Sequence, residues 1–300
     1  MHDTADAGVL SDNYAQLKLR FDSKFKAMWF TLNPRPRPCF NLGLLAELRN
    51  FQSELEQVNR LAIAHNAPVP IRYTVLASSV PGVFNFGGDL ELFSRLIQEH
   101  DREGLQQYAT ACIDVLYPNA VNFHQPLTTM TLVQGDALGG GFEAAISSNV
   151  VIAERSAAFG LPEIVFNLIP GMGAYTFLIR RVSPDVAERL ITSGRNLSAE
   201  QMLELRLVDV LAEDGQGEKA VNDYLAAHHR RSNAEAALQR VRQLVNPVTY
   251  EELIDITRIW VDAALQLTDR DLRLIARLVR AQSRAVENEN DPHTAIEGRG

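Results

Sequence analysis

The sequence predicts an α/β fold, and three observations support that prediction. Short apolar runs rich in β-forming side chains occur at residues 73–77, 127–133 and 150–153, and each is predicted to be a buried strand. Glycine-containing turns follow the first two runs, and segments of helical character follow the turns. Strand, turn and helix units that recur in this way are typical of an α/β architecture with functional loops at the strand ends.

The N-terminal part is predicted to begin with a β-hairpin. Leu17, Leu19 and Phe21 alternate with polar residues as in a half-buried strand, and residues 27–32 supply a second strand after a polar link. Three prolines within residues 33–38 end the hairpin, because proline has no amide hydrogen to donate to a sheet. We interpret this segment as a connecting loop, with a proline-rich recognition peptide as the alternative.

Helices are predicted between the strands. Asn41 is a suitable N-cap for a long helix in which apolar residues recur in steps of three and four as far as Leu61. Further helical segments are predicted at residues 90–99, 105–122 and 142–147.

The chain changes character after residue 214, where helical patterns replace strand patterns. Four helices are predicted there, over residues 218–229, 234–244, 250–267 and 269–285. The third is expected to place five apolar residues on one face, namely Leu253, Ile256, Trp260, Ala263 and Leu267.

The composition is that of a globular protein without a general affinity for nucleic acid. The 300 residues are 46% hydrophobic and 22% charged, which is ample for a large buried core. The formal net charge is -8, whereas phosphate binding needs clustered cations. Adjacent basic pairs occur at Arg180-Arg181 and Arg230-Arg231; we interpret them as solvated helix ends, with docking points for an acidic partner as the alternative.

Cysteine use and hydropathy favour a cytoplasmic protein. Cys39 and Cys112 are too few for a disulfide framework and lack the spacing of metal ligands. No apolar run approaches the roughly 18 residues expected of a membrane helix, and no signal-peptide pattern is present, so no membrane insertion is expected. His124 and the His228-His229 pair have no ligand-spaced partners, and no metal site is predicted.

Two glycine-rich loops, at residues 86–88 and 139–141, are predicted to follow strands and precede helices, the second within a turn over residues 135–141. Glycine lets backbone N–H groups approach a ligand that a Cβ atom would hold away. The spacings of a dinucleotide site and of a phosphate loop are both missing. The remaining interpretations are an oxyanion hole, in which amides face a developing negative oxygen, or plain tight turns.

Two glutamates accompany these loops. Glu143 is expected on the first turn of the helix that the second loop opens, and Glu163 is followed by an apolar stretch at residues 165–169. A carboxylate held against apolar side chains has its charged form disfavoured, which raises its pKa toward neutrality and suits it to proton transfer. A solvated charge at a helix start is the alternative for each glutamate alone.

These motifs resemble the crotonase (enoyl-CoA hydratase/isomerase) superfamily in order and spacing over residues 14–214. The segments that carry the resemblance are residues 84–89, 138–143, 159–163, 169–173 and 193–209. Within the superfamily, the chain resembles the diffusible-signal-factor synthases of bacterial quorum sensing. That finer resemblance lies in residues 86–90, 171–175, 259–262 and 278–283.

The resemblance implies roles for individual residues. The N–H groups of Phe86 and Gly140 are expected to form the oxyanion hole. Glu143 and Glu163 are expected to be the acid/base pair. Phe86 stands where ordinary hydratases usually have alanine, so its bulk is expected to reshape the pocket. Further substrate contacts are expected from Gly87, Gly139, Met172 and Trp260, with a core or subunit-contact role as the alternative for Trp260.

The resemblance also implies a reaction in two steps. A 3-hydroxyacyl thioester loses its C2 proton to one glutamate, while the other protonates the departing 3-hydroxyl. Water then attacks the thioester carbonyl and releases a free cis-2-unsaturated fatty acid, the diffusible signal, from acyl carrier protein. Which glutamate is the acid and whether hydrolysis follows dehydration stay open.

Two alternative functions remain at this point. One is an enoyl-CoA hydratase/isomerase of fatty-acid metabolism, and the other is a non-catalytic regulatory protein that binds a sensor kinase. The synthase resemblance itself implies acyl carrier protein as a partner, a sensor kinase as a second partner, and a homotrimer. No cofactor is expected.

The resemblance divides the chain into three parts. Residues 13–213 are predicted to form a crotonase-like spiral of repeated ββα units that contains the active site. Residues 214–290 are predicted to form a C-terminal helical region that closes the acyl pocket and makes subunit contacts. Residues 291–300 include Ile296-Glu297-Gly298-Arg299, which resembles a protease site, and are predicted to be a disordered tail or a cloning remnant.

Overall fold

The structure, a computed structural model, describes residue 10 and residues 13–289. The predicted tail at residues 291–300 lies outside this range. Within the described residues, no helix is both long enough and apolar enough to cross a membrane.

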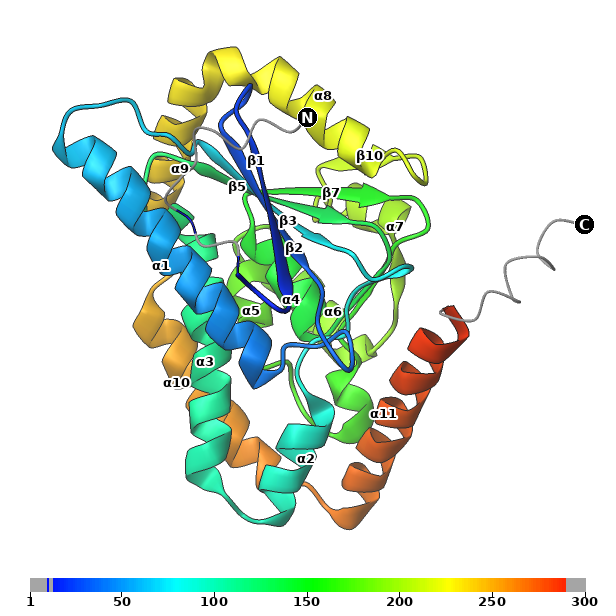
Figure 1. Cartoon of the computed structure of the whole chain (residues 1–300). Coiled ribbons are helices and arrows are strands. Elements are labelled where there is room, and N and C mark those ends of the chain that lie inside the picture. Colours follow the sequence, from blue (N-terminus) through cyan, green and yellow to red (C-terminus); the bar gives the residue numbers. More distant parts are fainter. Residues whose placement is uncertain (1–9, 11–12, 290–300) are drawn as a thin grey trace, which may run out of the picture.

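A six-stranded sheet forms the centre of the described part of the chain (Figure 1). Its strands lie in the order β1 (Leu17–Asp22), β2 (Ala27–Leu32), β3 (Tyr73–Ser78), β5 (Thr128–Val133), β7 (Val150–Glu154) and β10 (Val210–Ala212). β1 and β2 pair antiparallel, and the other neighbours pair parallel. The predicted hairpin and the three predicted buried strands are therefore confirmed.

A second sheet of four short strands lies within the described residues and was not predicted. Its order is β4 (Val83–Asn85), β6 (Asp136–Leu138), β8 (Ala158–Gly160) and β9 (Leu197–Ser198). β6 falls inside the segment predicted as a turn, so that prediction was wrong for three residues. Strands this short are below the four to eight residues over which alternation can be recognised in a sequence.

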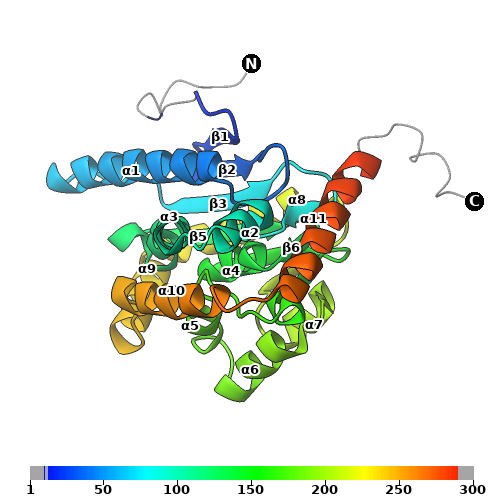
Figure 2. The same cartoon turned by 90° about the horizontal axis from the view of Figure 1, so that it is seen from below.

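Helices cover both faces of the large sheet (Figures 1 and 2). Side chains of β3 alternate: Val75 joins a cluster with Val221 and Leu225 of α8, whereas Leu76 joins the larger cluster on the other face. The helices of the described residues are α1 (Leu42–Ala64), α2 (Leu90–Gln98), α3 (Arg102–Ala120), α4 (Gly140–Ser147), α5 (Ala174–Leu178), α6 (Pro184–Ser193), α7 (Ala199–Glu204), α8 (Gly217–His228), α9 (Ser232–Val245), α10 (Tyr250–Ala264) and α11 (Asp269–Glu289). Short 3-10 helices occur at Asn122–His124, Pro162–Phe166 (η2) and His229–Arg231.

The predicted helices are present, with shifted ends. The Asn41 side chain caps α1 by accepting a hydrogen bond from the Leu44 amide at 2.9 Å, as expected from its position. α3 begins three residues earlier than predicted, because the Asp101 side chain caps it through the Gly104 amide. α10 ends at Ala264, and its buried face is rotated from the predicted one; the buried residues are Leu253, Thr257, Trp260, Val261 and Ala264.

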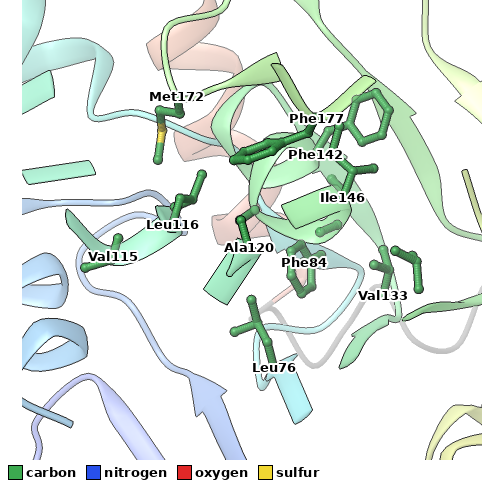
Figure 3. Close-up of a cluster of buried hydrophobic side chains, with 14 of the residues drawn as sticks. Leu76, Phe84, Val115, Leu116, Ala120, Val133, Phe142, Ile146, Met172 and Phe177 are labelled. Carbon is green, nitrogen blue, oxygen red and sulfur yellow. The ribbon is translucent and has the colours of Figure 1, made fainter. Parts of the chain in front are cut away.

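Helix α4 is buried along its whole length, which fixes the residues that it carries. Figure 3 shows Phe142 and Ile146 of α4 within an apolar cluster that also contains Leu116 and Phe177. Burying a side chain of this size contributes roughly 1.5–3 kcal/mol. The helix is thus held largely by apolar packing, and Glu143 is the charged residue within it.

The C-terminal helices pack against the core in two places. α10 contacts α3, and α11 contacts α2 and η2. α9, in contrast, has no buried residue and exposes Leu238, Val241, Leu244 and Val245. An exposed apolar stripe of this kind is typical of subunit contacts, and the homotrimer stays a prediction.

Candidate active site

The short sheet brings the predicted site residues together. β4, β6 and β8 run parallel and adjacent, so their carboxyl ends meet at one edge. Residues 86–89 follow β4, Gly139 follows β6, and Glu163 lies just after β8. Loops at the carboxyl ends of parallel strands are the usual place for a ligand site in α/β folds.

The two loops need glycine because neighbouring atoms occupy the space that a Cβ atom would take. A Cβ on Gly87, whose φ is +90°, would lie 2.5 Å from the Gly140 nitrogen. A Cβ on Gly139, with φ +52°, would lie 2.5 Å from Glu163 Oε1, and one on Gly140 would lie 2.2 Å from the Met172 sulfur. The backbones of the two loops are therefore in contact. Gly87 and Gly139, which were predicted to contact the substrate, allow this close approach because they have no Cβ atom.

Two backbone amides face the cavity without an acceptor. Gly140 is the first residue of α4, and the N–H groups of a helix's first turn have no partner inside the helix. Among the described residues, the Gly88 N–H likewise has no backbone acceptor, and both glycines line the same cavity.

The amide of Phe86 is not available, which corrects the predicted oxyanion hole. It donates to the Pro38 carbonyl at 2.7 Å, and the Phe40 amide donates to the Gly87 carbonyl at 2.8 Å. Residues 38–40 thus pair with the first loop as an added piece of strand. The left-handed backbone of Gly87 interrupts that pairing, and Gly88 carries the amide that remains unpaired. The Phe86 side chain still lines the cavity.

Tyr108 of α3 holds the first loop in place. Its buried hydroxyl donates to the Phe40 carbonyl at 2.8 Å and accepts from the Asp89 amide at 2.6 Å. Because Gly88 precedes Asp89 directly, this bridge fixes the position of the unpaired amide. Burial is the main cause that raises the pKa of Tyr108 well above its usual value, so the hydroxyl keeps its proton.

Replacing Tyr108 by phenylalanine is expected to loosen that loop. The change leaves the Phe40 carbonyl and the Asp89 amide without partners, which costs about 1–3 kcal/mol of the free energy of unfolding. We also expect kcat/KM to fall several-fold, as measured on the purified variant. Tyr250→Phe is the matched control, because that hydroxyl donates to Asp114 at 2.8 Å and lies outside the cavity lining. Equal losses of activity in both variants would contradict this role of Tyr108.

Glu143 is buried, with only 1% of its surface exposed. Its Oε1 atom accepts hydrogen bonds from the amides of Met172 and Ala174, each at 2.8 Å. Burial raises the pKa of Glu143 to about 7, and the two amide hydrogen bonds act in the opposite direction. These bonds orient the carboxylate and keep an ionised form accessible near neutral pH.

Glu163 lies in the first turn of η2 and has a different environment. Its Oε2 atom is buried and has no hydrogen-bond partner among the described residues. Burial, followed by the charge of Glu143, raises the pKa of Glu163 to about 8. Of the two carboxyl groups, Glu163 therefore holds its proton more readily than Glu143.

The raised pKa of Glu163 makes a prediction about stability. The usual value is 4.5 and the folded value is about 8, so between these pH values the folded state binds more protons than the unfolded state. Stability contributed by the neutral carboxyl is consequently lost as pH rises from 4.5 to 8. Glu163→Gln stays neutral, and we expect it to be more stable than the parent protein at pH 9 by on the order of 2 kcal/mol, after a discount for partial exposure.

Unfolding in denaturant at pH 9 and at pH 4.5 measures this effect. The advantage of Glu163→Gln should disappear at the lower pH, where the carboxyl is protonated in both states. A stability difference of the same size at both pH values would show that the substitution acts through packing.

The two glutamates and the two free amides border one cavity of about 340 Å³, within the ~300–1,000 Å³ range of small-molecule sites. Its far wall is apolar and comes from α2, η2 and α10. Trp260 packs edge-on against Phe93, with ring centroids 5.9 Å apart, and Phe93 lies 6.4 Å from Phe166. Met172 and Trp260 both line the cavity as expected, and their contact with a substrate stays a prediction.

Sequence reasoning missed several lining residues. Tyr108, Asp136, Asn196 and Gln282 all border the cavity. Asp136 was missed because its strand was predicted to be a turn. Burial raises the pKa of its carboxyl group. Asn196 and Gln282 lie in segments that carry the family resemblance but were given no role in the site. Tyr108 carries no local signal, because its position depends on how α3 packs over the site. Within the described residues, no three His, Cys, Asp or Glu side chains are arranged to hold a metal ion.

Comparison with known proteins identifies relatives of the chain. Residues 52–286 match the family described as enoyl-CoA hydratase/isomerase. The chain is 29% identical over 191 residues to a probable mitochondrial enoyl-CoA hydratase 2 of Arabidopsis thaliana, covering 63% of this chain and 57% of that protein. It is 39% identical over 125 residues to a 2,3-dehydroadipyl-CoA hydratase of Escherichia coli, covering 40% of this chain and 48% of that protein. The chain thus matches about half the length of these curated relatives.

Solved structures share the fold. DspI of Pseudomonas aeruginosa matches with a TM-score of 0.65 and 23% identity, over 78% of this chain and 88% of that chain. An enoyl-CoA hydratase of Bacillus halodurans matches with a TM-score of 0.71 and 21% identity, over 87% of this chain and 100% of that chain. These likenesses confirm the predicted fold class, an α/β core followed by a C-terminal helical region.

Proposed function

The chain belongs to the enoyl-CoA hydratase/isomerase family, and from that premise we propose that it adds or removes water at the C2–C3 bond of an acyl thioester. One observation carries this proposal. Buried Glu143 and partly buried Glu163, whose pKa values are raised to about 7 and about 8, border the same cavity as two unpaired backbone amides. Proton transfer at C2 and at the oxygen bonded to C3 needs such a pair, and the enolate formed between the two transfers needs the amides.

The amides of Gly88 and Gly140 would bind the thioester oxygen. As the C2 proton leaves, negative charge moves onto that oxygen, and two fixed N–H donors stabilise it without reorganisation. Removing one donor of this kind typically costs about 2.7–4 kcal/mol, or 10²–10³ in kcat. Burial of the site strengthens the effect, because it excludes competing water.

The directions of the pKa shifts support one assignment of the two glutamates. In the direction of water addition, ionised Glu143 takes a proton from water, the hydroxide attacks C3, and protonated Glu163 delivers its proton to C2. Dehydration follows the same path backward, so Glu163 removes the C2 proton and Glu143 protonates the departing hydroxyl. Two features contribute to the difference: the charge of Glu143 raises the pKa of Glu163, and the amides of Met172 and Ala174 lower the pKa of Glu143.

For the substrate we propose a 3-hydroxyacyl chain carried by acyl carrier protein, which the resemblance to the signal synthases favours. Dehydration yields a 2-enoyl thioester. Water then adds to the thioester carbonyl in the same amide hole, the C–S bond breaks, and the products are a free cis-2-unsaturated fatty acid and the carrier thiol. The apolar wall around Trp260, Phe93 and Phe166 supports an acyl chain as the occupant. A sensor kinase as a second partner and a cytoplasmic location stay predictions.

A coenzyme-A-dependent hydratase is the second candidate, because the curated relatives carry that name. Incubation with 3-hydroxydodecanoyl carrier protein and, separately, with crotonyl-CoA, followed by mass spectrometry, distinguishes the two. We expect free unsaturated acid from the carrier substrate. An enoyl chain that stays bound to the carrier would refute the hydrolysis step, and turnover of crotonyl-CoA alone would select the second candidate.

A further inference from the structure

Helix α11 carries a row of arginines on one side. Their spacing is three and four residues, which places side chains on the same face of an α-helix. The four within the part whose side chains are described are exposed, namely Arg270, Arg273, Arg277 and Arg280. Arg284 continues the same spacing in the sequence. We refer to Arg270, Arg273, Arg277 and Arg280 as the arginine row.

Three of the four charges of this row have no ion-pair partner among the described residues, whereas Arg270 interacts with the Asp271 carboxylate. Within the described residues, no ion pair involves Arg273, Arg277 or Arg280. Asp271 lies in the same helix, but its carboxylate accepts hydrogen bonds from the amide and hydroxyl of Thr268 at 2.9 and 2.7 Å. The chain has a net charge of -8, so a cluster of cations without ion-pair partners is unusual for its surface.

The opposite side of the same helix closes the candidate active site. Ile275 is fully buried, and Leu278 and Gln282 line the cavity that contains Glu143 and Glu163. An α-helix with its side chains is about 10–12 Å across. The arginine row therefore lies about one helix diameter from the cavity.

The shape of the row decides which anion it suits. From Arg270 to Arg280 it extends about 15 Å along a convex helix surface, at 1.5 Å per residue. None of its members lines any of the four best-formed cavities of the described residues. A small anion needs charges that converge in a hollow, whereas an extended line of outward guanidinium groups matches a line of carboxylates on a second protein.

We infer that the outer face of α11 is the docking surface for an acidic carrier protein, whose thioester arm reaches the cavity past the same helix. The inference rests on the proposed function, because it supposes that the substrate arrives attached to a protein. Complementary charge would steer the encounter and align the partner, and the row lies close enough to the cavity for a flexible arm to span the distance.

Binding without turnover tests the surface. Purified acidic acyl carrier protein with its phosphopantetheine arm and no acyl chain is titrated into the parent protein and into the double variant R273E/R277E, with fluorescence anisotropy as the readout. We expect Kd to rise at least tenfold in the variant. The parent Kd should also rise with added salt, because exposed charges are screened. The matched control is K18E/K24E, which reverses two exposed lysines of the β1–β2 hairpin and should leave Kd unchanged.

Turnover separates this inference from the proposed function. A short thioester of N-acetylcysteamine carries the acyl group without a protein, so R273E/R277E should convert it at the parent rate, which also shows that the variant is folded. An unchanged Kd for the carrier protein, or an equal loss on the short thioester, overturns the docking surface. A third outcome also overturns the docking surface. In that outcome the parent protein binds anionic phospholipid vesicles and not the carrier protein, and R273E/R277E loses the vesicle binding. If the parent protein converts neither thioester, the proposed function fails, whatever the binding result.

Discussion

Glu143→Gln is expected to lower kcat by about 10²–10⁴-fold, the usual effect of losing a positioned acid or base. The substitution keeps Oε1, which accepts from the amides of Met172 and Ala174, so the fold around it should survive. It removes the ability of the side chain to take and return a proton. Glu143→Gln/Glu163→Gln should lose little more than either single variant, because the two groups act in one proton cycle.

Glu154→Gln is the matched control for that loss. Glu154 is also a buried glutamate, and its Oε1 accepts from Gln134 at 2.9 Å and from the Gly217 amide at 2.8 Å. It lies on β7 outside the cavity lining, so its replacement should affect stability and leave kcat within a few-fold. Steady-state kinetics on a 3-hydroxyacyl thioester gives the comparison. A Glu143→Gln variant with more than a tenth of the parent activity would rule out Glu143 as an essential proton carrier.

Gly87→Ala is expected to lower kcat by 10²–10³-fold, the effect of losing one amide donor of an oxyanion hole. The new Cβ would lie 2.5 Å from the Gly140 nitrogen and 2.9 Å from the Leu138 carbonyl oxygen. Both are backbone atoms, so the two loops must separate, and the amides of Gly88 and Gly140 can no longer converge on one oxygen. Stability should fall as well, since an alanine at positive φ costs about 1–2 kcal/mol.

Gly215→Ala separates the effect of the steric clash from the effect of an alanine at positive φ. Gly215 also has a positive φ, of +75°, but an added Cβ there meets nothing within 4 Å. It carries the backbone cost without the clash, so its kcat should match that of the parent protein. Kinetics and thermal unfolding on both variants complete the test. If Gly87→Ala keeps full activity, the close contact of the two loops has no part in catalysis.

The sequence could predict five of the six strands of the large sheet, because these strands have five or six residues and show their character; β10, which has three residues, was not predicted. Residues 128–133 are all buried, and they appear in the sequence as a continuous apolar and β-branched run. The short sheet could not be predicted in this way. β6 has three residues, and its pairing with β4 and β8 depends on segments about fifty residues before it and twenty after it.

The sequence predicted the catalytic side chains of the site better than its backbone donors. Both glutamates stand next to sequence motifs, whereas the choice between the amides of Phe86 and Gly88 depends on a hydrogen bond to Pro38. No local pattern shows that contact. The arginine row was missed for a different reason. Charges on one helix face are separated by three or four positions, so they do not appear in the sequence as adjacent basic pairs.

The division of the site among strand ends has a consequence for the order in which the protein acquires activity. The amide donors follow β4 and β6, the second glutamate follows β8, and the amides that orient Glu143 come from Met172 and Ala174. Residues 139–174 contain both glutamates, the Gly140 amide and the amides that orient Glu143, whereas the Gly88 amide comes from the segment that follows β4. During synthesis the site can form only after residue 174 has left the ribosome, and contacts of such long sequence separation form late in folding. Recovery of activity after denaturation should therefore follow the slowest step of core assembly.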